Sequence, residues 1–199
     1  MTQTLQKPDA ISSRLPDIGL FVECIATRNN LEMHGAWIDL SLLTEAADFY
    51  ACINFILATS PQPNAEEWEV TDNTCPTFLI GKPAQDIVDW AHEYDSFSGD
   101  EDTQYAFECY CSERNQLLTR QEFEDAFLGF YRDEADFAWH RADERGGIPA
   151  ELEAYIDWER LWEGEYECNG FTSIDVYRSH RPGLMQAQSN SDVAIFRPV

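Results

Sequence analysis

The sequence predicts an α+β protein with strands near both ends of the chain and helices between them. Runs of apolar and β-branched residues at 18–26 and 193–196 are typical of strands, and residues 66–72 alternate between apolar and polar. Apolar residues at helical spacing dominate 84–145 instead. Hydrophobic residues make up 44% of the 199, which is enough to build folded cores despite the acidity of the chain.

The first 72 residues predict a leader and then a small domain with the order strand, strand, helix, strand. Residues 1–17 are polar, contain two prolines and are expected to form a loose leader. Turn residues at 27–30 separate the first two strands, which indicates a hairpin with a longer loop. The elements expected in this domain are strands at 18–26, 34–40 and 66–72, and a helix from the caps at 41–44 to about residue 59.

Strand patterns stop at about residue 73, and helices are predicted over most of the chain from there to residue 145. Thr119 and Glu122 have the spacing of a capping box, in which two side chains satisfy the first backbone N–H groups of a helix. The helix that they open is expected to carry Phe123, Phe127 and Phe130 on one side. Other helices are predicted at 84–94 and 132–145, the latter with Phe137 and Trp139 as candidates for burial.

The stretch 146–171 combines large apolar side chains with seven carboxylates and a single cation. Pro149 and the acidic residues after it are typical of a helix start. Asp157 is a suitable N-cap for a second short helix, so the pattern allows either one helix or two. The side chains expected on one buried stripe are Leu152, Tyr155 and Ile156, continued on the same face by Glu159 or, after a break, by Trp158, Leu161 and Trp162. The short runs at 171–176 and 193–196 are β-like, and a polar loop is expected between them at 179–191.

The net charge of −24 is the most unusual property of the sequence. Residues 62–170 contain 28 of the 37 Asp and Glu residues but only seven of the 13 Lys and Arg residues. A net charge of roughly 2–8 in magnitude is enough to keep a small domain in solution, and a larger charge destabilises the folded state by self-repulsion. A cationic partner is therefore expected. The same sign disfavours direct binding to nucleic acid or to an anionic membrane.

Patterns that would indicate an enzyme or a metal site are weak. The sequence contains no P-loop, GxGxxG or nucleophile elbow, and its four histidines (His34, His92, His140 and His180) lie far apart. Residues 95–102 have the acid content of a calcium loop but lack the bidentate Glu at the required spacing. Six scattered cysteines form no CxxC pair and are expected to be reduced thiols, most of them buried. We predict no catalytic residue, no metal and no cofactor.

The acidity is sufficient to imitate a length of duplex DNA. Duplex DNA carries one charge per about 1.7 Å of its axis, so 24 net charges correspond to about 40 Å, or roughly 12 base pairs. The acids occur singly and in pairs between aromatic residues, which predicts carboxylates fixed on folded faces. Those expected to stand where phosphates would are Glu66, Glu67, Glu69, Asp72, Asp86, Asp89, Glu93, Asp95, Asp100, Glu101, Asp102, Glu108, Glu113, Glu122, Glu124, Asp125, Asp133, Glu134, Asp136, Asp143, Glu144, Glu151, Glu153, Asp157, Glu159, Glu163, Glu165 and Glu167.

Four segments of the sequence resemble the ArdA family of antirestriction proteins. They are FLGFYRDEADF at 127–137, GIPAELEAYIDWERL at 147–161, GAWID at 35–39 and WEVTD at 68–72. The similarity covers about residues 18–176 and the last strand. It implies a non-enzymatic DNA mimic that occupies the DNA-binding groove of type I restriction–modification enzymes. Restriction is expected to be inhibited, and the resemblance leaves inhibition of modification open.

The resemblance also implies an architecture. Family members are elongated homodimers carried by mobile elements, with an α/β first domain, a small helical middle domain and an α/β third domain. The corresponding ranges here are 18–72, 73–118 and 119–199, while the leader 1–17 and the loop 179–191 depart from the family pattern. The family's antirestriction motif falls on 148–163, near the dimer contact of the third domain. The residues assigned to the motif and the dimer contact are Ile148, Pro149, Leu152, Tyr155, Ile156, Asp157, Trp158 and Leu161.

Two other functions remain as alternatives. An acidic module that binds or sequesters another basic or DNA-binding protein would explain the charge equally well. An enzyme that uses a carboxylate is the weaker alternative, because carboxylate pairs are too abundant here for any one of them to indicate a site. The sequence also has no run approaching 18 apolar residues and no signal-peptide pattern, which predicts a cytoplasmic protein.

Overall fold

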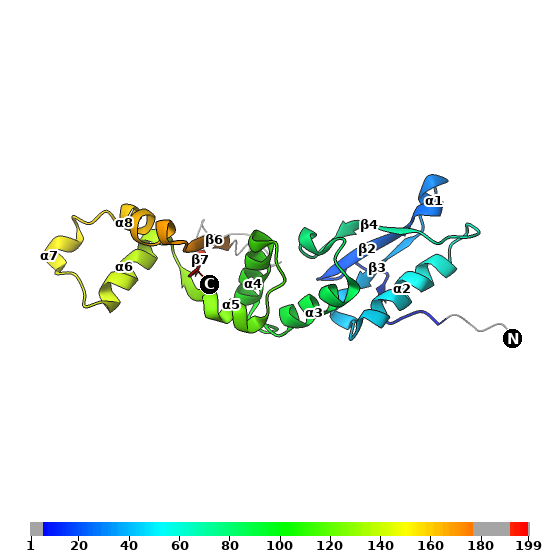
Figure 1. The fold of residues 1–199 in the computed structure, drawn as a ribbon, viewed down its shortest axis with the longest axis horizontal. Coiled ribbons are helices and arrows are strands. Elements are labelled where there is room, and N and C mark those ends of the chain that lie inside the picture. Colours follow the sequence, from blue (N-terminus) through cyan, green and yellow to red (C-terminus); the bar gives the residue numbers. More distant parts are fainter. Residues whose placement is uncertain (1–5, 177–191, 199) are drawn as a thin grey trace. The chain divides into compact units, whose positions relative to one another are not determined.

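The structure is a computed structural model that describes residues 6–176 and 192–198. The chain divides into two compact units, the first formed by residues 1–98 and 111–118 and the second by 99–110 and 119–199. Each unit contains helices and one small antiparallel sheet, so the predicted α+β class is confirmed (Figure 1). The segment 73–118 is shared between the two units. The three-domain arrangement is therefore not confirmed and stays a prediction.

The sheet of the first unit contains β1 (Ile11–Ser12), β2 (Gly19–Cys24), β3 (Gly35–Asp39) and β4 (Trp68–Asn73) in the order β1-β3-β2-β4. The three strands predicted at 18–26, 34–40 and 66–72 are confirmed, and β2 and β3 pair antiparallel as the hairpin pattern indicated. Strand β1 corrects the prediction that all of 1–17 is loose. Ile11 pairs with Ile38 and is 6% exposed, so burial of its side chain fixes this part of the leader.

Helix α2 (Ala46–Ala58) packs on one face of this sheet, as predicted from its apolar spacing. Its buried face carries Phe49, Ile53 and Ile56, and the Phe49 ring lies edge-on to Trp68 at 6.0 Å. Residues 25–29, which span the end of the predicted strand 18–26 and most of the predicted turn 27–30, instead form the short helix α1 (Ile25–Asn29). The unit is completed by η1 (Leu40–Leu42), η2 (Thr77–Leu79) and the predicted helix α3 (Ala84–Asp95).

The second unit contains the helices α5 (Arg120–Ala126), α6 (Glu134–Glu144), α7 (Ala150–Glu153) and α8 (Trp158–Glu165), and η3 (Glu167–Asn169). Helix α4 (Glu101–Arg114) contains the boundary between the units. The sheet has the order β5-β7-β6, with β5 (Phe127–Tyr131), β7 (Asp192–Phe196) and β6 (Thr172–Val176) all antiparallel. The β-like runs at 171–176 and 193–196 are thus confirmed, whereas the predicted loop 179–191 lies outside the described residues.

Strand β5 corrects the prediction of a helix that continues through Phe127 and Phe130. The capping box is present, because Thr119 accepts from the Glu122 amide and the Glu122 side chain accepts from Thr119, but the helix ends at Ala126. Gly129 has φ +124°, a conformation that residues with a Cβ rarely adopt, and the pairing of β5 with β7 is irregular at this point. Aromatic residues on both sides of a glycine with this positive φ favour a bulged strand over a helix.

A cluster of aromatic and branched side chains holds the second unit together. Phe137 of α6 is fully buried among Trp162 of α8, Tyr166 at the C-terminal end of α8, and Val193 and Ile195 of β7. The ring of Phe137 lies 5.0 Å from Tyr166 and 5.6 Å from Trp162, both edge-on. The prediction that Phe137 is buried is confirmed, while Trp139 is only half-buried. This core fixes α6 and α8 side by side, and both helices carry acids.

Candidate functional site

The predicted carboxylates lie on the surfaces of both units. Of the 28, 21 are exposed, seven are half-buried and none is buried. Most sit on helices and strands with fixed backbones, which agrees with the expectation of carboxylates held on folded faces. The half-buried ones are Asp86, Glu93, Asp102, Glu108, Asp133, Glu134 and Asp136.

An open hollow of about 340 Å³ lies between α6 and α8 in the second unit. Its lining contains five carboxylates, of Asp133, Glu134, Glu159, Glu163 and Glu167, together with Ala135 and Trp162. Trp162 is 7% exposed and belongs to the core, so the hollow has a rigid apolar base and an acidic wall. No Lys or Arg contributes to its lining. The hollow concentrates negative charge in one place and is suited to receive a cationic group.

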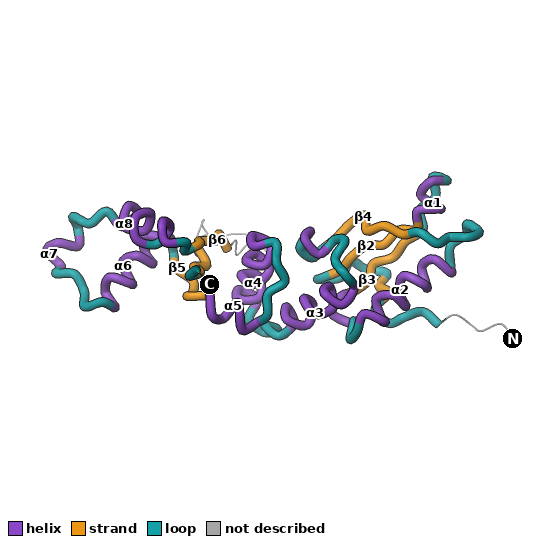
Figure 2. Tube along the Cα trace, viewed as in Figure 1, coloured by secondary structure: helices purple, strands orange, loops and turns teal. Residues whose placement is uncertain are grey.

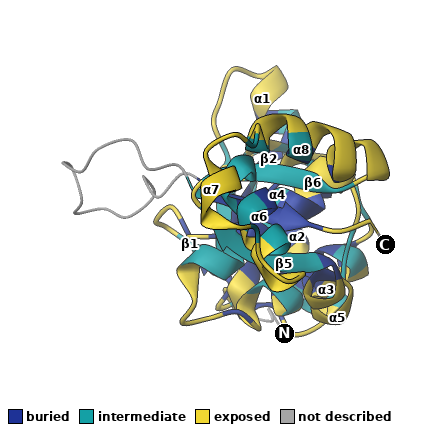
Figure 3. Cartoon of the chain, turned by 90° about the vertical axis from the view of Figure 1, so that its left-hand side faces the viewer, coloured by how far each residue is buried: buried dark blue, intermediate teal, exposed yellow. Residues whose placement is uncertain are grey.

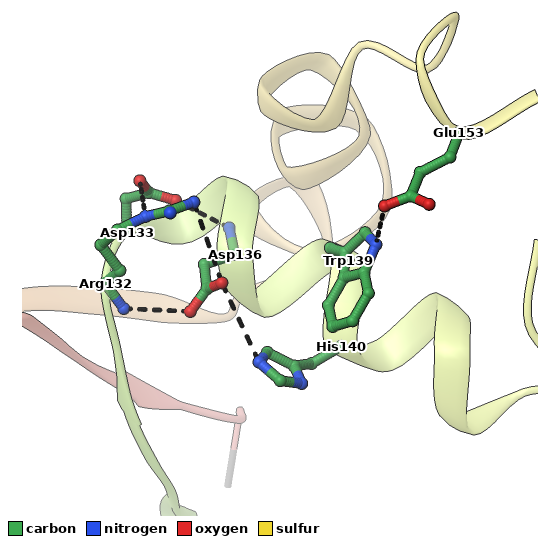
Figure 4. A network of polar contacts seen from close by, with 6 residues as sticks. All are labelled: Arg132, Asp133, Asp136, Trp139, His140 and Glu153. Carbon is green, nitrogen blue, oxygen red and sulfur yellow. Dashed lines mark hydrogen bonds and ion pairs between the residues drawn. The ribbon is translucent and has the colours of Figure 1, made fainter. Parts of the chain in front are cut away.

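At the start of α6, Asp133 and Asp136 are engaged in ion pairs and hydrogen bonds (Figure 4). Arg132 Nε lies 3.1 Å from Asp133, its Nη2 lies 3.9 Å from Asp136, and its backbone N–H donates to Asp136 at 3.2 Å. Asp133 also caps the helix, since it accepts from the Asp136 amide at 2.7 Å. These two carboxylates therefore stabilise the helix start. Of the predicted set, they are less available to a partner than Glu159 or Glu163.

Ion pairs with arginine also engage Glu69, Glu124 and Glu144 among the predicted carboxylates. The partners are Arg28, Arg120 and Arg141, and both members of each pair retain a third or more of their exposure. Exposed pairs of this kind are worth about 0–1 kcal/mol and exchange readily with solvent and other ions. They leave these acids usable in an electrostatic interface.

Two of the predicted carboxylates have shifted proton affinities. Hydrogen bonds from the backbone and the hydroxyl of Thr119 lower the pKa of Glu122, which keeps this exposed side chain charged. Burial on α4 raises the pKa of Glu108 to about 7. Glu108 is therefore protonated more readily near neutral pH than an acid of ordinary pKa, and its role as a phosphate mimic stays a prediction.

Glu108→Gln is expected to make the protein more stable at pH 8, with a smaller gain at pH 5.5. Because the folded-state pKa of Glu108 lies above its ordinary value, the folded protein binds the extra proton, and stability falls as pH rises from about 4.5 through 7. The gain should grow by about 1–2 kcal/mol between the two pH values, measured by urea unfolding. Glu113→Gln, on the exposed side of the same helix, is the control that should show no such growth.

The motif residues form two helices, which decides between the alternatives left open by the sequence. Asp157 accepts from the Arg160 amide at 3.0 Å and caps α8, while Pro149 precedes α7. The predicted buried stripe is wrong at its start, where Leu152 is 55% exposed and Tyr155 is 85% exposed, and is confirmed at Trp162, which is 7% exposed. The reason is that α7 has only four residues and the chain turns before α8, so these side chains never reach the core. Figure 3 draws α7 as exposed along its length.

The connection around α7 is nevertheless anchored to α6. Trp139 donates from its indole N–H to Glu153 at 2.7 Å (Figure 4). These two side chains, with Trp158 and Ile148, are among those that line a small hollow of about 40 Å³. Ile148, Ile156, Trp158 and Leu161 are half-buried, whereas Pro149 and Asp157 are exposed. The motif thus has one side turned toward its own unit and an apolar part turned toward solvent.

The remaining titratable groups have structural roles where the structure describes them. His92 lies 2.9 Å from the carbonyl of Leu43, which agrees with its prediction as a satisfied side chain. None of the six cysteines forms a disulfide. Burial together with Asp48 raises the pKa of Cys52 to about 11. Among residues 6–176 and 192–198, no group of three or more His, Cys, Asp or Glu side chains has the arrangement of a metal site.

One acid that the sequence did not single out is placed unusually. Glu23 lies in the central strand β2 and is 9% exposed, more buried than any of the 28 predicted carboxylates. The sequence does contain a sign of this placement, because Glu23 is a single acid inside the apolar run 18–26. Such a position is unusual, since Lys, Glu, Arg and Asp are rarely buried without a partner.

Within the described residues, none of the helices has both the length and the apolar character that a membrane span needs.

The fold and its surfaces define a strongly acidic α+β protein with an acidic hollow that is suited to receive a cationic group. Residues 20–177 match the family described as antirestriction protein (ArdA), and the chain belongs to this family. No curated protein matches the chain. Membership supports an antirestriction function in general and implies an interaction with restriction–modification enzymes.

Proposed function

We propose that this protein is a DNA mimic that occupies the DNA-binding groove of a type I restriction–modification enzyme and thereby inhibits restriction. The observation that carries the proposal is the placement of the acids: 28 carboxylates in residues 62–170, none of them buried, on a chain that matches the ArdA family. Carboxylates on rigid helices and strands present negative charge at fixed positions, as phosphates do on a duplex. A groove that reads phosphates by charge accepts such a surface without reading any sequence.

The energetic basis of the mimicry is electrostatic. Lys and Arg side chains that neutralise phosphates dominate the affinity of proteins for DNA, and they steer association over distances of about a Debye length. The acids of α8 and the hollow between α6 and α8 would meet the same cations. Binding of mimic and DNA is then mutually exclusive, and no covalent chemistry is involved. The enzyme acts in the cytoplasm, where the mimic would also be located.

Competition with DNA tests this proposal. The purified chain is titrated into a complex of a type I methyltransferase core with a fluorescent duplex that contains its site, and displacement is followed by anisotropy. We expect complete displacement with a single competitive constant. If the chain binds the enzyme while the duplex stays bound, it is instead an acidic module for another surface. If it does not bind at all, mimicry of this class of enzyme is excluded.

We also propose that the protein is a homodimer through the motif at 148–163. Leu152 and Tyr155 leave a large apolar area in contact with solvent, which a second copy of the chain would cover. A two-fold pair would double the charged surface available to the enzyme.

Tyr155→Asp is expected to convert the dimer to a monomer that remains folded, because the Tyr155 side chain is 85% exposed and supports no core packing. Light scattering after size-exclusion chromatography should show at least a 100-fold loss of dimer affinity. Met33→Asp is the matched control, since Met33 is 87% exposed in the other unit. A wild-type chain that is monomeric at all concentrations, or a Tyr155→Asp dimer of normal affinity, would rule out this interface.

A further inference from the structure

One face of the first unit's sheet contains an acid that is buried and has no partner. Helix α2 packs on the face that carries Leu20, Val22 and Ile38, all of which are fully buried. Side chains alternate along a strand, so Phe21 and Glu23 of β2 belong to the opposite face. The residues directly across from them in the neighbouring strands share that face, and they are Trp37 and Gly35 of β3 and Asp72 and Glu69 of β4. Figure 2 shows α2 running beside these strands.

Glu23 is the unusual member of this face. It is only 9% exposed, and in the part of the chain that the structure describes, no hydrogen bond or ion pair engages its carboxylate. The nearest candidate cation on this face, Arg28, is already bound to Glu69 through its Nη1 at 2.5 Å. The carboxylate oxygens themselves still reach solvent, although most of the side chain is covered, so a donor group from outside can approach them.

The register makes the position of Glu23 unfavourable. Glu23 is directly opposite Glu69 in the antiparallel pair of β2 and β4, and like charges at directly opposite positions repel. On the other side its neighbour is Gly35, which has no side chain to donate a hydrogen bond. A Cβ at Gly35 would come within 2.5 Å of the Val22 carbonyl oxygen and 3.0 Å of the Phe21 ring, so a larger residue does not fit there. The fold therefore holds a carboxylate open toward this face and offers it no internal cation.

An aromatic pair lies next to this carboxylate. Phe21 and Trp37 are half-buried, and their ring centroids are 5.4 Å apart at an interplanar angle of 60°. Aromatic faces attract cations, most strongly when the cation is desolvated, and Arg does so more often than Lys. A planar guanidinium can stack on a ring and donate two parallel hydrogen bonds to a carboxylate, whereas an ammonium group cannot do both in this geometry.

We infer that this face, formed by Phe21, Glu23 and Trp37, is a binding site for an arginine side chain of the partner protein. Glu23 accepts from the guanidinium, and the Phe21–Trp37 pair provides the surface on which it stacks. Asp72 at the edge strand β4 adds negative charge around the site, while Glu69 is already paired with Arg28. The identity of the partner as a restriction–modification enzyme rests on the proposed function; the site itself does not.

The site gives the mimic a contact that DNA does not supply in this form. Phosphate–arginine contacts on a duplex are exposed and sensitive to salt, while an arginine between an aromatic pair and a buried carboxylate is shielded from ions. Such a contact slows dissociation more than it speeds association. It would allow an acidic protein to displace DNA that has a higher charge density.

Titration of the full chain with N-acetyl-arginine amide tests the site directly. Nuclear magnetic resonance should detect saturable shifts at the Trp37 indole and at the backbone of 21–23 and 35–37, with a dissociation constant in the millimolar range. N-acetyl-lysine amide should bind at least fivefold more weakly. Shifts spread evenly over all acidic regions, or equal binding of the two ligands, would overturn the inference.

Glu23→Gln separates a binding role from a structural one. We expect it to weaken arginine binding at least fivefold and to leave the melting temperature unchanged or slightly raised, because it removes a charge directly opposite Glu69. Asp17→Asn, an exposed acid of the same unit that is not a member of the predicted set, changes the net charge equally and should leave both quantities unchanged. A Glu23→Gln protein that is less stable, or that binds arginine normally, contradicts the site.

The same variants distinguish this inference from the proposed function. If the wild type displaces DNA from the enzyme and Glu23→Gln does so with unchanged dissociation rate, the arginine site fails while mimicry stands. If the wild type does not displace DNA but binds arginine at Trp37, mimicry fails and the site remains. The expected result is displacement by both proteins, with dissociation from the enzyme about tenfold faster for Glu23→Gln.

Discussion

Replacement of Glu159, Glu163 and Glu167 by glutamine is expected to weaken binding to a type I restriction–modification enzyme by about 10- to 100-fold at low salt. The three side chains are exposed, they line the hollow between α6 and α8, and they follow one another at intervals of four residues. Each exposed contact with a cation is worth about 0.5–1 kcal/mol, and three such contacts give this range. None of the three caps a helix, so the loss should concern binding alone.

Salt should affect the wild type and this triple variant differently. Binding that depends on charge weakens as ionic strength rises, and for DNA with 6–10 phosphate contacts the loss between 50 and 200 mM salt is about 10³–10⁵-fold. We expect a steep decrease for the wild type and a shallower one for the variant, measured by the competition assay over that range. An affinity that barely changes with salt would exclude an electrostatic mimic.

The control for both effects is a second triple variant with the same change in net charge. Asp9, Asp17 and Glu32 are exposed acids outside residues 62–170 and are not members of the predicted set. Their replacement by amides should reduce affinity less than threefold. If the two variants lose affinity equally, total charge matters and position does not. The melting temperature of the Glu159, Glu163 and Glu167 variant should rise slightly, since like charges at i and i+4 repel along a helix. Such a rise would exclude unfolding as the cause of weaker binding.

The elements of the fold that were predicted correctly are those that depend on interactions between residues close together in the sequence. The alternation in 66–72, the helical spacing in 84–94 and the capping box at Thr119 and Glu122 each depend on contacts within a few residues, and each is present in the structure. Burial of Phe137 also follows from its place on an amphipathic helix.

The errors arise where contacts distant in the sequence decide the structure. Residues 127–131 have an apolar spacing that suits either a helix or a strand, and pairing with β7, more than 60 residues later, selects the strand. Leu152 and Tyr155 match a buried stripe by spacing, but burial needs a partner surface, and α7 has none within its own unit. Local periodicity measures which residues can be buried and does not identify what covers them.

The candidate site was predictable in composition and only partly in detail. The sequence identified the acids, because ionised side chains remain on the surface almost regardless of the fold. It could not separate Asp133 and Asp136, which are engaged by Arg132, from Glu159 and Glu163, which are not. Nor could it detect that Glu108 is partly desolvated or that Glu23 opposes Glu69, since both depend on the packing and register of elements that are separate in the sequence.

Replacement of Phe137 by alanine is expected to have the largest effect on stability. Phe137 is fully buried, and its ring contacts four other aromatic rings, of Tyr131, Trp162, Tyr166 and Phe171, at centroid distances of 5.0–6.2 Å. Removal of a buried phenyl group destabilises a protein by about 3–5 kcal/mol, because the lost transfer energy is added to a cavity that rigid rings cannot fill. Against a typical total of about 5–15 kcal/mol, much of the second unit would unfold at moderate temperature.

Hydrogen exchange locates this effect within the chain. Protection should fall in α6, α8 and the β5-β7-β6 sheet and should persist in β2 and β3, because Phe137 lies in the core of the second unit and the two sheets belong to different units. Trp139→Phe is the matched control on the same helix: it removes the hydrogen bond to Glu153 but keeps a large ring, and about 1 kcal/mol is expected. Equal losses for the two variants would mean that the aromatic cluster does not hold this unit together. Equal loss of protection in both sheets would mean that the chain unfolds as one body. Selective loss would instead make α6 and α8 the elements whose stability limits how firmly the acidic hollow is held for a partner.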